Sequence, residues 1–144
     1  MGRAKRVGRR RKARETALQF LYQLDVGGGD DPTSEAAEFW SRHPVDLEAR
    51  TFAEELVVGT KQNQAKIDGL IAQWAEHWDL DRMAAVDRNI LRAAVYELLW
   101  HPEVPPKVTI NEAIEIAKKF GTQESGRFIN GILDRIFKEL RPAS

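Results

Sequence analysis

Hydrophobic residues recur along this chain at spacings of three and four, the pattern of amphipathic helices, and no stretch follows the two-residue alternation of a strand. The first helix is expected over about residues 9–25. Its apolar stripe comprises Ala17, Leu18, Leu21 and Leu24. Glycines 27–29 predict the end of this helix. A short helix capped by Thr33 or Ser34 is expected next, up to a break at His43-Pro44.

The same spacing continues through the middle of the chain. It predicts helices over about residues 46–60 and 62–76, and a longer helix from Asp79 or Asp81 to Leu99. The positions expected to face the core are Phe52, Leu56, Val57, Ile67, Leu70, Ile71, Trp74, Met83, Val86, Ile90, Leu91, Ala94, Val95 and Leu98.

Three prolines between residues 102 and 106 predict a stiff connector. Thr109 and Glu112 then have the spacing of a capping box, so a helix is expected to begin at Thr109 and to end near Gly121. Thr122 or Ser125 is expected to open the last helix, before Pro142. About seven helices with short connections predict an all-α fold in a single domain.

The composition narrows the class of protein. A chain of 144 residues with 42% hydrophobic and 31% charged residues is typical of one soluble globular domain. No window approaches the roughly 18 consecutive apolar residues of a membrane helix, and the basic N-terminus lacks the apolar stretch of a secretory signal. The absence of cysteine excludes disulfides, thiolate metal sites and cysteine nucleophiles. We therefore expect a cytoplasmic protein with no membrane partner.

The net charge of zero conceals a strong asymmetry. The first 14 residues hold eight basic residues and no acidic one. The rest of the chain keeps 14 of the 22 basic residues and all 22 acidic ones, a net charge of −8. A cationic arm on an acidic body favours a polyanionic partner for the arm alone.

No set of residues predicts catalysis. His43, His77 and His101 are far apart and lie near predicted helix ends, without the spacing of a metal site, so we expect surface or helix-end positions. The serines lack the setting of a nucleophile. Glycines 27–29 follow a helix and precede two aspartates, the wrong context for a phosphate loop. We expect no catalytic residue, no metal and no cofactor.

The first candidate binding feature is the basic cluster of Arg9, Arg10, Arg11, Lys12 and Arg14. Cations oppose the dipole at a helix N-terminus, and phosphate neutralisation would offset that cost. A solubility tail, an expression remnant or a nuclear import signal are the alternatives on charge alone. Because the arginines run into the apolar stripe, Arg11 and Arg14 are expected to belong to the folded helix. Alanine replacement of Arg10, Arg11 and Arg14 is expected to weaken RNA binding and to leave the fold intact.

The second candidate feature joins the last two helices. Its polar residues are Lys118, Lys119, Thr122, Gln123, Glu124, Ser125 and Arg127. Cations and polar side chains around a helix N-terminus suit single-stranded RNA, although lysines at a helix C-terminus are also a common capping device. Core packing is expected for Phe120 and Phe128, and for all four tryptophans.

Three stretches resemble one protein family. Residues 9–22 resemble the opening of the bacterial transcription antitermination factor NusB, and residues 91–98 resemble the family's fifth helix. Residues 104–121 and 125–134 match its C-terminal signature, which is the most specific of these similarities. Residues 27–45 match no family pattern.

The resemblance implies a fold of two packed three-helix subdomains, about residues 9–77 and 79–141, after a flexible basic arm over residues 1–8. It implies binding to single-stranded boxA RNA of nascent ribosomal RNA together with the ribosomal protein NusE, within the antitermination complex on RNA polymerase. Arg9, Arg10, Arg11 and Arg14 match the family's arginine motif. Lys118, Gln123, Glu124, Ser125 and Arg127 match its second RNA-contacting region. Tyr22, Asp87 and Arg88 fall where its RNA and NusE surfaces meet.

Two other functions stay open. NusB-like domains also precede ribosomal RNA methyltransferase domains, although no glycine-rich cofactor loop follows a strand in this chain. Arginine-rich helices also bind the major groove of DNA. The sequence leaves a homodimer open as well.

Overall fold

The computed structural model describes residues 2–29, 31–75 and 79–140, with side chains from residue 8 onward. This part of the chain contains seven α-helices, one short 3-10 helix and no strand. The elements are α1 (Gly2–Gly27), α2 (Pro32–Arg42), α3 (Leu47–Gln62), α4 (Gln64–Trp74), η1 (Leu80–Arg82), α5 (Ala85–Trp100), α6 (Pro106–Phe120) and α7 (Ser125–Leu140). The all-α prediction is therefore confirmed.

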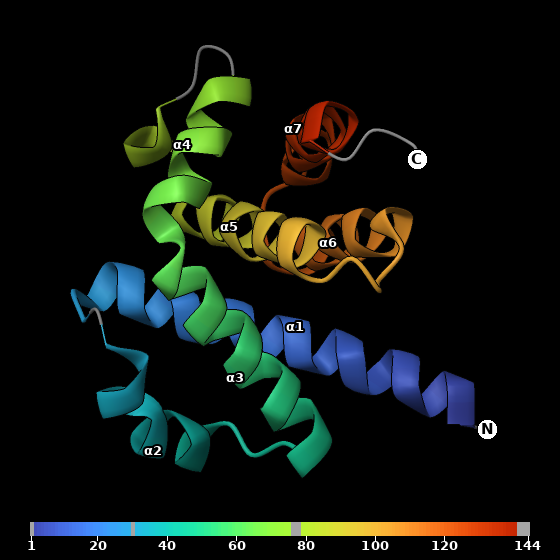
Figure 1. Ribbon diagram of the computed structural model, residues 1–144. Coiled ribbons are helices and arrows are strands. Elements are labelled where there is room, and N and C mark those ends of the chain that lie inside the picture. The colour runs from blue at the N-terminus through green and yellow to red at the C-terminus, as the bar shows by residue number, and fades with distance from the viewer. Residues whose placement is uncertain (1, 30, 76–78, 141–144) are drawn as a thin grey trace.

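Helix α5 is the central element of the packing. It contacts α1 and α3 on one side and α4, α6 and α7 on the other (Figure 1). Its residues Leu91, Val95 and Leu98 are almost completely buried, as their helical spacing predicts. One continuous cluster of buried hydrophobic residues runs across all these helices. The division into two subdomains near residue 78 stays a prediction, because residues 76–78 lie outside the described part.

Helix α1 begins earlier than expected. Its helical backbone starts at Gly2 instead of near Arg9. The flexibility of the arm over residues 1–8 stays a prediction. Arginine, lysine and alanine favour helix, and no proline interrupts the segment. The end of α1 follows the prediction, because Gly28 adopts a positive φ of 79° that favours glycine.

The N-cap of α2 is neither of the two residues that were predicted to cap it. Asp31 is the N-cap, and its side chain accepts a hydrogen bond from the Thr33 backbone N–H at 2.9 Å. Neither Thr33 nor Ser34 precedes the helix, because Pro32 already occupies its first position. The long helix expected from Asp79 or Asp81 is also divided, into η1 and α5.

The prediction of a capping box at Thr109 and Glu112 is wrong. Helix α6 begins at Pro106, so both residues lie inside it and their side chains are free for tertiary contacts. Proline at a first helical position loses no hydrogen bond, so the second proline of the pair starts the helix. Ser125 does open α7, and its Oγ accepts a hydrogen bond from the Thr122 N–H at 2.9 Å.

His101 lies at a helix end, as predicted, because it directly follows α5. Its side chain is buried beside Glu55 and Glu103. Its Nδ1 lies 2.8 Å from a carboxylate oxygen of Glu103. Trp40 is buried, and Trp74 and Trp100 are partly buried, as expected for packing. The predictions for His77 and Trp78 fall outside the described residues.

Candidate nucleic-acid interface

The basic cluster of α1 wraps around the helix instead of forming one flat face. Ala13 and Ala17 are fully buried, which turns this side of α1 toward the core. Arg9, Arg10 and Lys12 are exposed. Arg14 follows Ala13 directly and is buried with it. Only part of the basic cluster is therefore accessible to a ligand.

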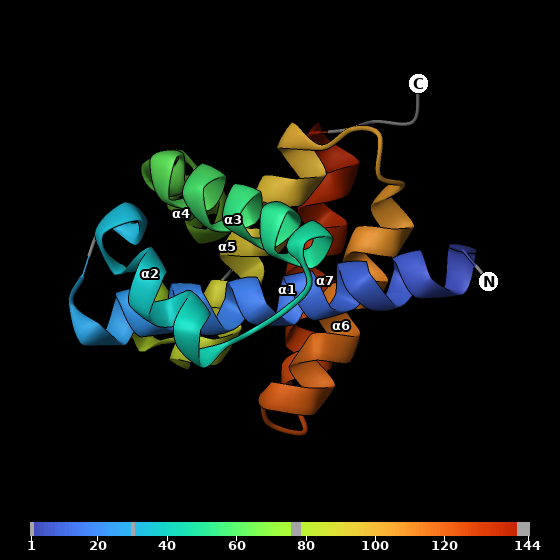
Figure 2. The ribbon, with the colours of Figure 1, turned by 90° about the horizontal axis from the view of Figure 1, so that it is seen from below.

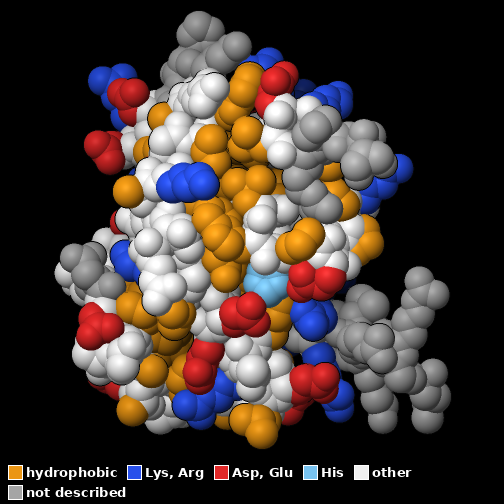
Figure 3. Space-filling view, viewed as in Figure 1, with side chains coloured by type: hydrophobic (Ala, Val, Ile, Leu, Met, Phe, Trp, Pro, Cys, Tyr) orange, Lys and Arg blue, Asp and Glu red, His pale blue; other side chains and the backbone are white. Residues whose placement is uncertain are grey.

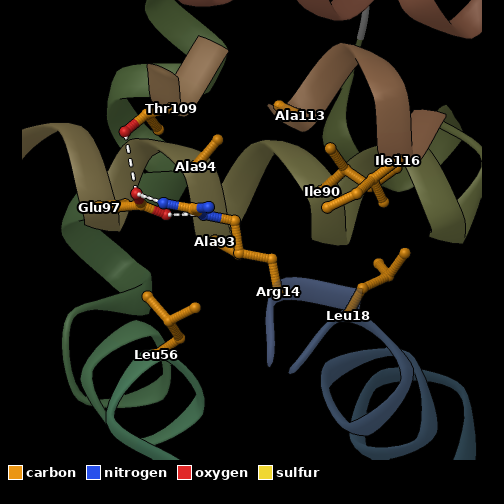
Figure 4. A pocket seen from close by; sticks show the side chains of 10 residues that line it. All are labelled: Arg14, Leu18, Leu56, Ile90, Ala93, Ala94, Glu97, Thr109, Ala113 and Ile116. Atoms are coloured by element: carbon orange, nitrogen blue, oxygen red, sulfur yellow. Dashed lines mark hydrogen bonds and ion pairs between the residues drawn. The ribbon is translucent and has the colours of Figure 1, made fainter. Parts of the chain in front are cut away.

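Arg14 forms a buried ion pair with Glu97 of α5. Its guanidinium donates to both carboxylate oxygens, from Nε at 2.9 Å and from NH2 at 2.6 Å (Figure 4). The Thr109 hydroxyl donates to Glu97 Oε2 at 3.0 Å. The adjoining cavity, of about 30 Å³, holds little more than a water molecule and is too small for a nucleotide.

This environment gives Arg14 a structural role. The Arg14 side chain is 9% exposed and that of Glu97 is 3% exposed, so removing one would leave the other charged and buried. This contradicts the expectation that alanine at Arg14 leaves the fold intact. The sequence signal for Glu97 was its place between Ala94 and Leu98 on the buried face of α5.

Arg9 and Arg11 are exposed cations held by carboxylates. Arg11 donates to Glu112 of α6 from Nε at 3.1 Å and from NH2 at 2.6 Å. These hydrogen bonds and the charge of Glu112 raise the pKa of Arg11. Arg9 donates to Glu48 at 2.7 Å, and its Nε lies 3.5 Å from Asp46. None of these three acidic partners was anticipated, since all are distant in sequence.

Arg10 rests on an aromatic ring. Its guanidinium carbon lies 3.8 Å from the centroid of Phe52 in α3, a cation–π geometry. Arg10 also lines two open grooves, of about 570 Å³ and 520 Å³. The first runs beside Pro105 and Val108, and the second runs along α3. The guanidinium is thus positioned by the fold and open to solvent.

The joint between α6 and α7 holds the second group of candidates. Lys118, Thr122, Gln123, Glu124 and Arg127 are all exposed there. Lys119 is exposed but pairs with Glu15 of α1 at 3.1 Å. Ser125 is 1% exposed, and its hydroxyl is engaged with Thr122. Ser125 therefore shapes the joint, while the other residues remain accessible. Phe120 and Phe128 pack against the core, as expected.

The two basic regions are connected through α6. Helices α1 and α6 cross in Figure 2, and side-chain pairs join them at two points, Arg11 with Glu112 and Glu15 with Lys119. Arg9 and Arg10 lie on the N-terminal side of this crossing, and the joint lies just beyond Lys119. The two basic regions therefore flank one pair of crossing helices.

The third group of candidates lies at the other end of α1. Tyr22 is 40% exposed. Asp87, in the first turn of α5, is half-buried, and its Oδ1 is buried without a hydrogen-bond partner. Arg88 is different, because it donates to Asp25 and to the carbonyls of Leu80 and Met83. These hydrogen bonds hold this corner of the fold together. This structural role of Arg88 was not predicted when the residue was assigned to a partner surface.

Arg88 belongs to a polar network that sequence reasoning missed. Asp25 accepts hydrogen bonds from Arg88 and Asn89 at 2.9 Å each, and Arg92 donates to Asp68 of α4. Burial alone would raise the pKa of Asp25, but the hydrogen bonds from Asn89 and Arg88 and the nearby cations lower it overall. The network ties α1, α4 and α5 together below the Tyr22 surface.

Two negative findings apply to the described residues. No helix in ranges 2–29, 31–75 and 79–140 is long and apolar enough to cross a membrane. Within the same ranges, no three histidine, aspartate or glutamate side chains are grouped to hold a metal ion.

Comparison with known proteins places the chain in a family. A sequence model of the NusB family matches residues 11–138. The transcription antitermination protein NusB of Anaeromyxobacter dehalogenans (strain 2CP-1) is 51% identical over 140 residues, which cover 95% of this chain and 96% of the relative. NusB of Sorangium cellulosum is 46% identical over 134 residues, covering 93% and 95% respectively.

Solved structures agree with this similarity. The structure of NusB from T. maritima superposes with a TM-score of 0.84 at 44% identity, covering 92% of this chain and 93% of that one. A crystal structure of the antitermination factors NusB and NusE in complex with dsRNA gives a TM-score of 0.82 at 30% identity, covering 91% and 97%. The chain belongs to the NusB family.

Proposed function

We propose that this protein is a transcription antitermination factor that binds single-stranded boxA RNA of nascent ribosomal RNA together with NusE. The observation that carries the proposal is the alignment of two basic regions, on α1 and at the joint of α6 and α7, on either side of one helix crossing. Transcription antitermination is the function of the relatives, and one related structure holds NusB with NusE and dsRNA.

The exposed cations supply the attraction for phosphate. Each phosphate that they neutralise releases a counterion, so the affinity falls as salt rises. Exposed polar side chains such as those of the joint are able to contact base edges. We assign phosphate contacts to Arg9, Arg10, Arg11, Lys12, Lys118, Lys119 and Arg127, and base contacts to Thr122, Gln123 and Glu124. Arg14 and Ser125 support these residues from inside the fold.

The NusE surface is proposed around Tyr22 and Asp87. Asp25 lies one turn after Tyr22 on α1 and bonds to Arg88, the neighbour of Asp87 on α5. The ion pair therefore brings the exposed ring and the carboxylate to one corner of the molecule. Arg88 holds that corner and does not itself reach the partner.

The protein acts in this proposal as a non-enzymatic adaptor within the RNA polymerase complex. Its place of action is the bacterial cytoplasm, where nascent ribosomal RNA is made. No residue of the site is assigned a catalytic role.

The test is a titration of boxA RNA and of a scrambled RNA, each with and without NusE, over a range of salt concentrations. We expect boxA to bind more tightly, most clearly with NusE present. If about five phosphates are neutralised, the log–log salt slope is about −3.5. Equal affinity for both RNAs under all conditions, or preference for a duplex DNA competitor, would contradict the proposal.

A further inference from the structure

The accessible arginines of α1 differ in the groups that their guanidinium ions contact. Arg9 and Arg11 are each bonded to a carboxylate from another helix, whereas Arg10 lies on the Phe52 ring. Near the N-terminal end of α1, acidic side chains alternate with basic ones on the visible surface (Figure 3). The described part of the basic cluster is therefore already partly neutralised within the protein.

The pair of Arg11 and Glu112 is the strongest of these contacts. Glu112 engages both Nε and NH2 of Arg11, which is the fork with which arginine binds a phosphate. A phosphate and the Glu112 carboxylate would thus compete for the same donors. The two partners are unequally exposed, 45% for the Arg11 side chain and 10% for that of Glu112.

This inequality decides which partner is able to leave. Arg11 can turn into solvent, where a charged guanidinium is well hydrated. Glu112 stays behind, but Arg14 NH1 lies 3.6 Å from its Oε1, the oxygen that Arg11 Nε also contacts. The carboxylate therefore retains a cation when Arg11 departs, and the usual cost of an unpaired buried charge is avoided. Arg14 keeps its own bidentate contact with Glu97 throughout.

We propose that Glu112, and to a smaller degree Glu48, occupy the phosphate-binding positions of Arg11 and Arg9 in the free protein, so that RNA must displace these carboxylates to bind. The inference rests on the proposed function and adds a regulatory contact to the same site. Arg10 and Lys12, which these carboxylates do not hold, make the first phosphate contacts, and Arg11 and Arg9 then exchange carboxylate for phosphate. The contact lowers affinity for every polyanion that uses Arg11.

Glu112→Gln tests the proposal, because it removes the competing charge and keeps a side chain of the same shape. The matched control is Glu38→Gln on α2, which makes the same change of net charge in the pair with Arg42, away from all candidate RNA residues. We expect Glu112→Gln to bind RNA about two- to fivefold more tightly, because Arg11, the partner that has to be freed, is the solvent-exposed member of the pair. We expect Glu38→Gln to match the wild type.

A double-mutant cycle separates competition from positioning. If Glu112 competes with RNA, Arg11→Ala costs more RNA affinity in the Glu112→Gln background than in the wild type. If Glu112 instead holds Arg11 ready for RNA, Glu112→Gln binds more weakly and the cycle reverses. Weaker or unchanged binding by a Glu112→Gln variant with wild-type helicity and Tm overturns the proposal.

Two further measurements keep the test decisive. Inorganic polyphosphate, titrated against the same variants, reports on the contact without depending on RNA as the natural ligand. If the variants bind polyphosphate as the wild type does, the carboxylates do not compete with phosphate and the inference is refuted. If instead only the preference for boxA over scrambled RNA is absent, the proposed function is refuted. If Glu112→Gln does not fold, Glu48→Gln replaces it, since Glu48 is 68% exposed on α3. Tighter polyphosphate binding by Glu48→Gln supports the proposal, and unchanged binding overturns it.

Discussion

Replacing Arg14 with alanine separates a structural role for this residue from an RNA contact. The guanidinium spans from α1 to α5, with two hydrogen bonds to Glu97 and a further contact with Glu112 at 3.6 Å. Without it, the buried Glu97 carboxylate keeps only the Thr109 hydroxyl among its described partners. We therefore expect a large loss of stability from a residue inside the basic cluster.

The magnitude follows from the burial of the pair. Breaking a buried ion pair on one side costs about 3–5 kcal/mol, because the remaining charge is left without compensation. With an unfolding entropy of about 2.1 cal/mol/K per residue, this corresponds to a fall in Tm of about 10–17 °C for the 144-residue chain. The exposed pair of Arg42 and Glu38 is worth less than about 1 kcal/mol, so Arg42→Ala lowers Tm by only a few degrees.

Thermal and urea denaturation followed by circular dichroism measure these differences. The double variant with Arg14→Met and Glu97→Leu is expected to recover most of the loss, because an apolar pair of similar volume leaves no buried charge. RNA affinity is measured in parallel, well below the Tm of each variant. A fall in Tm of less than about 3 °C for Arg14→Ala, which is about 1 kcal/mol, together with a clear loss of RNA affinity, would show that Arg14 contacts RNA and is not a structural anchor.

Three further predictions test other parts of the molecule. Because the pKa of Asp25 is lowered in the fold, its contribution to stability is present at pH 7 and is lost as the pH falls through that pKa. Asp25→Asn should therefore lower the urea midpoint at pH 7, and the difference should narrow below about pH 4; a constant difference would contradict this. Gly59→Ala should cost about 1–3 kcal/mol, because its Cβ would overlap the Tyr96 ring, whereas Gly69→Ala, in open space on α4, should gain about 0.5–1 kcal/mol. Equal Tm shifts for the two would refute the packing argument. Arg127→Ala should weaken RNA binding and flatten the salt slope by about 0.7, and an unchanged slope would exclude a phosphate contact.

Helical periodicity was sufficient to predict the fold class, because each helix buries a stripe that is visible in the sequence. Ala17, Leu21 and Leu24 on α1 are buried as their spacing indicates, and so are Ile90 and Leu98 on α5. The errors occurred at helix ends, where competing signals are close together. Helix α6 begins at Pro106, three residues before the capping box predicted at Thr109, and α1 begins at Gly2, seven residues before its predicted start.

Side-chain partners could not be predicted in the same way. Arg14 and Glu97 are 83 residues apart, and Arg11 and Glu112 are 101 residues apart. A run of arginines specifies charge but not which members are turned inward, and this depends on the packing of α5 and α6. The sequence signal lay in the acidic partner instead of the arginines. Glu97 is a charged residue in an apolar stripe and so requires a buried cation.

The mixture of buried and exposed arginines in one helix has a mechanical consequence for binding. Successive residues of an α-helix are about 100° apart, so fixing the direction of Arg14 toward Glu97 also fixes where Arg10 and Arg11 point. The bidentate contact resists rotation of α1 about its axis, because a rotated guanidinium would lose both hydrogen bonds at once. A lysine at position 14 would keep the charge but not this constraint. The exposed cations therefore leave the helix backbone in fixed directions toward RNA, because one arginine of the cluster is withdrawn from the surface.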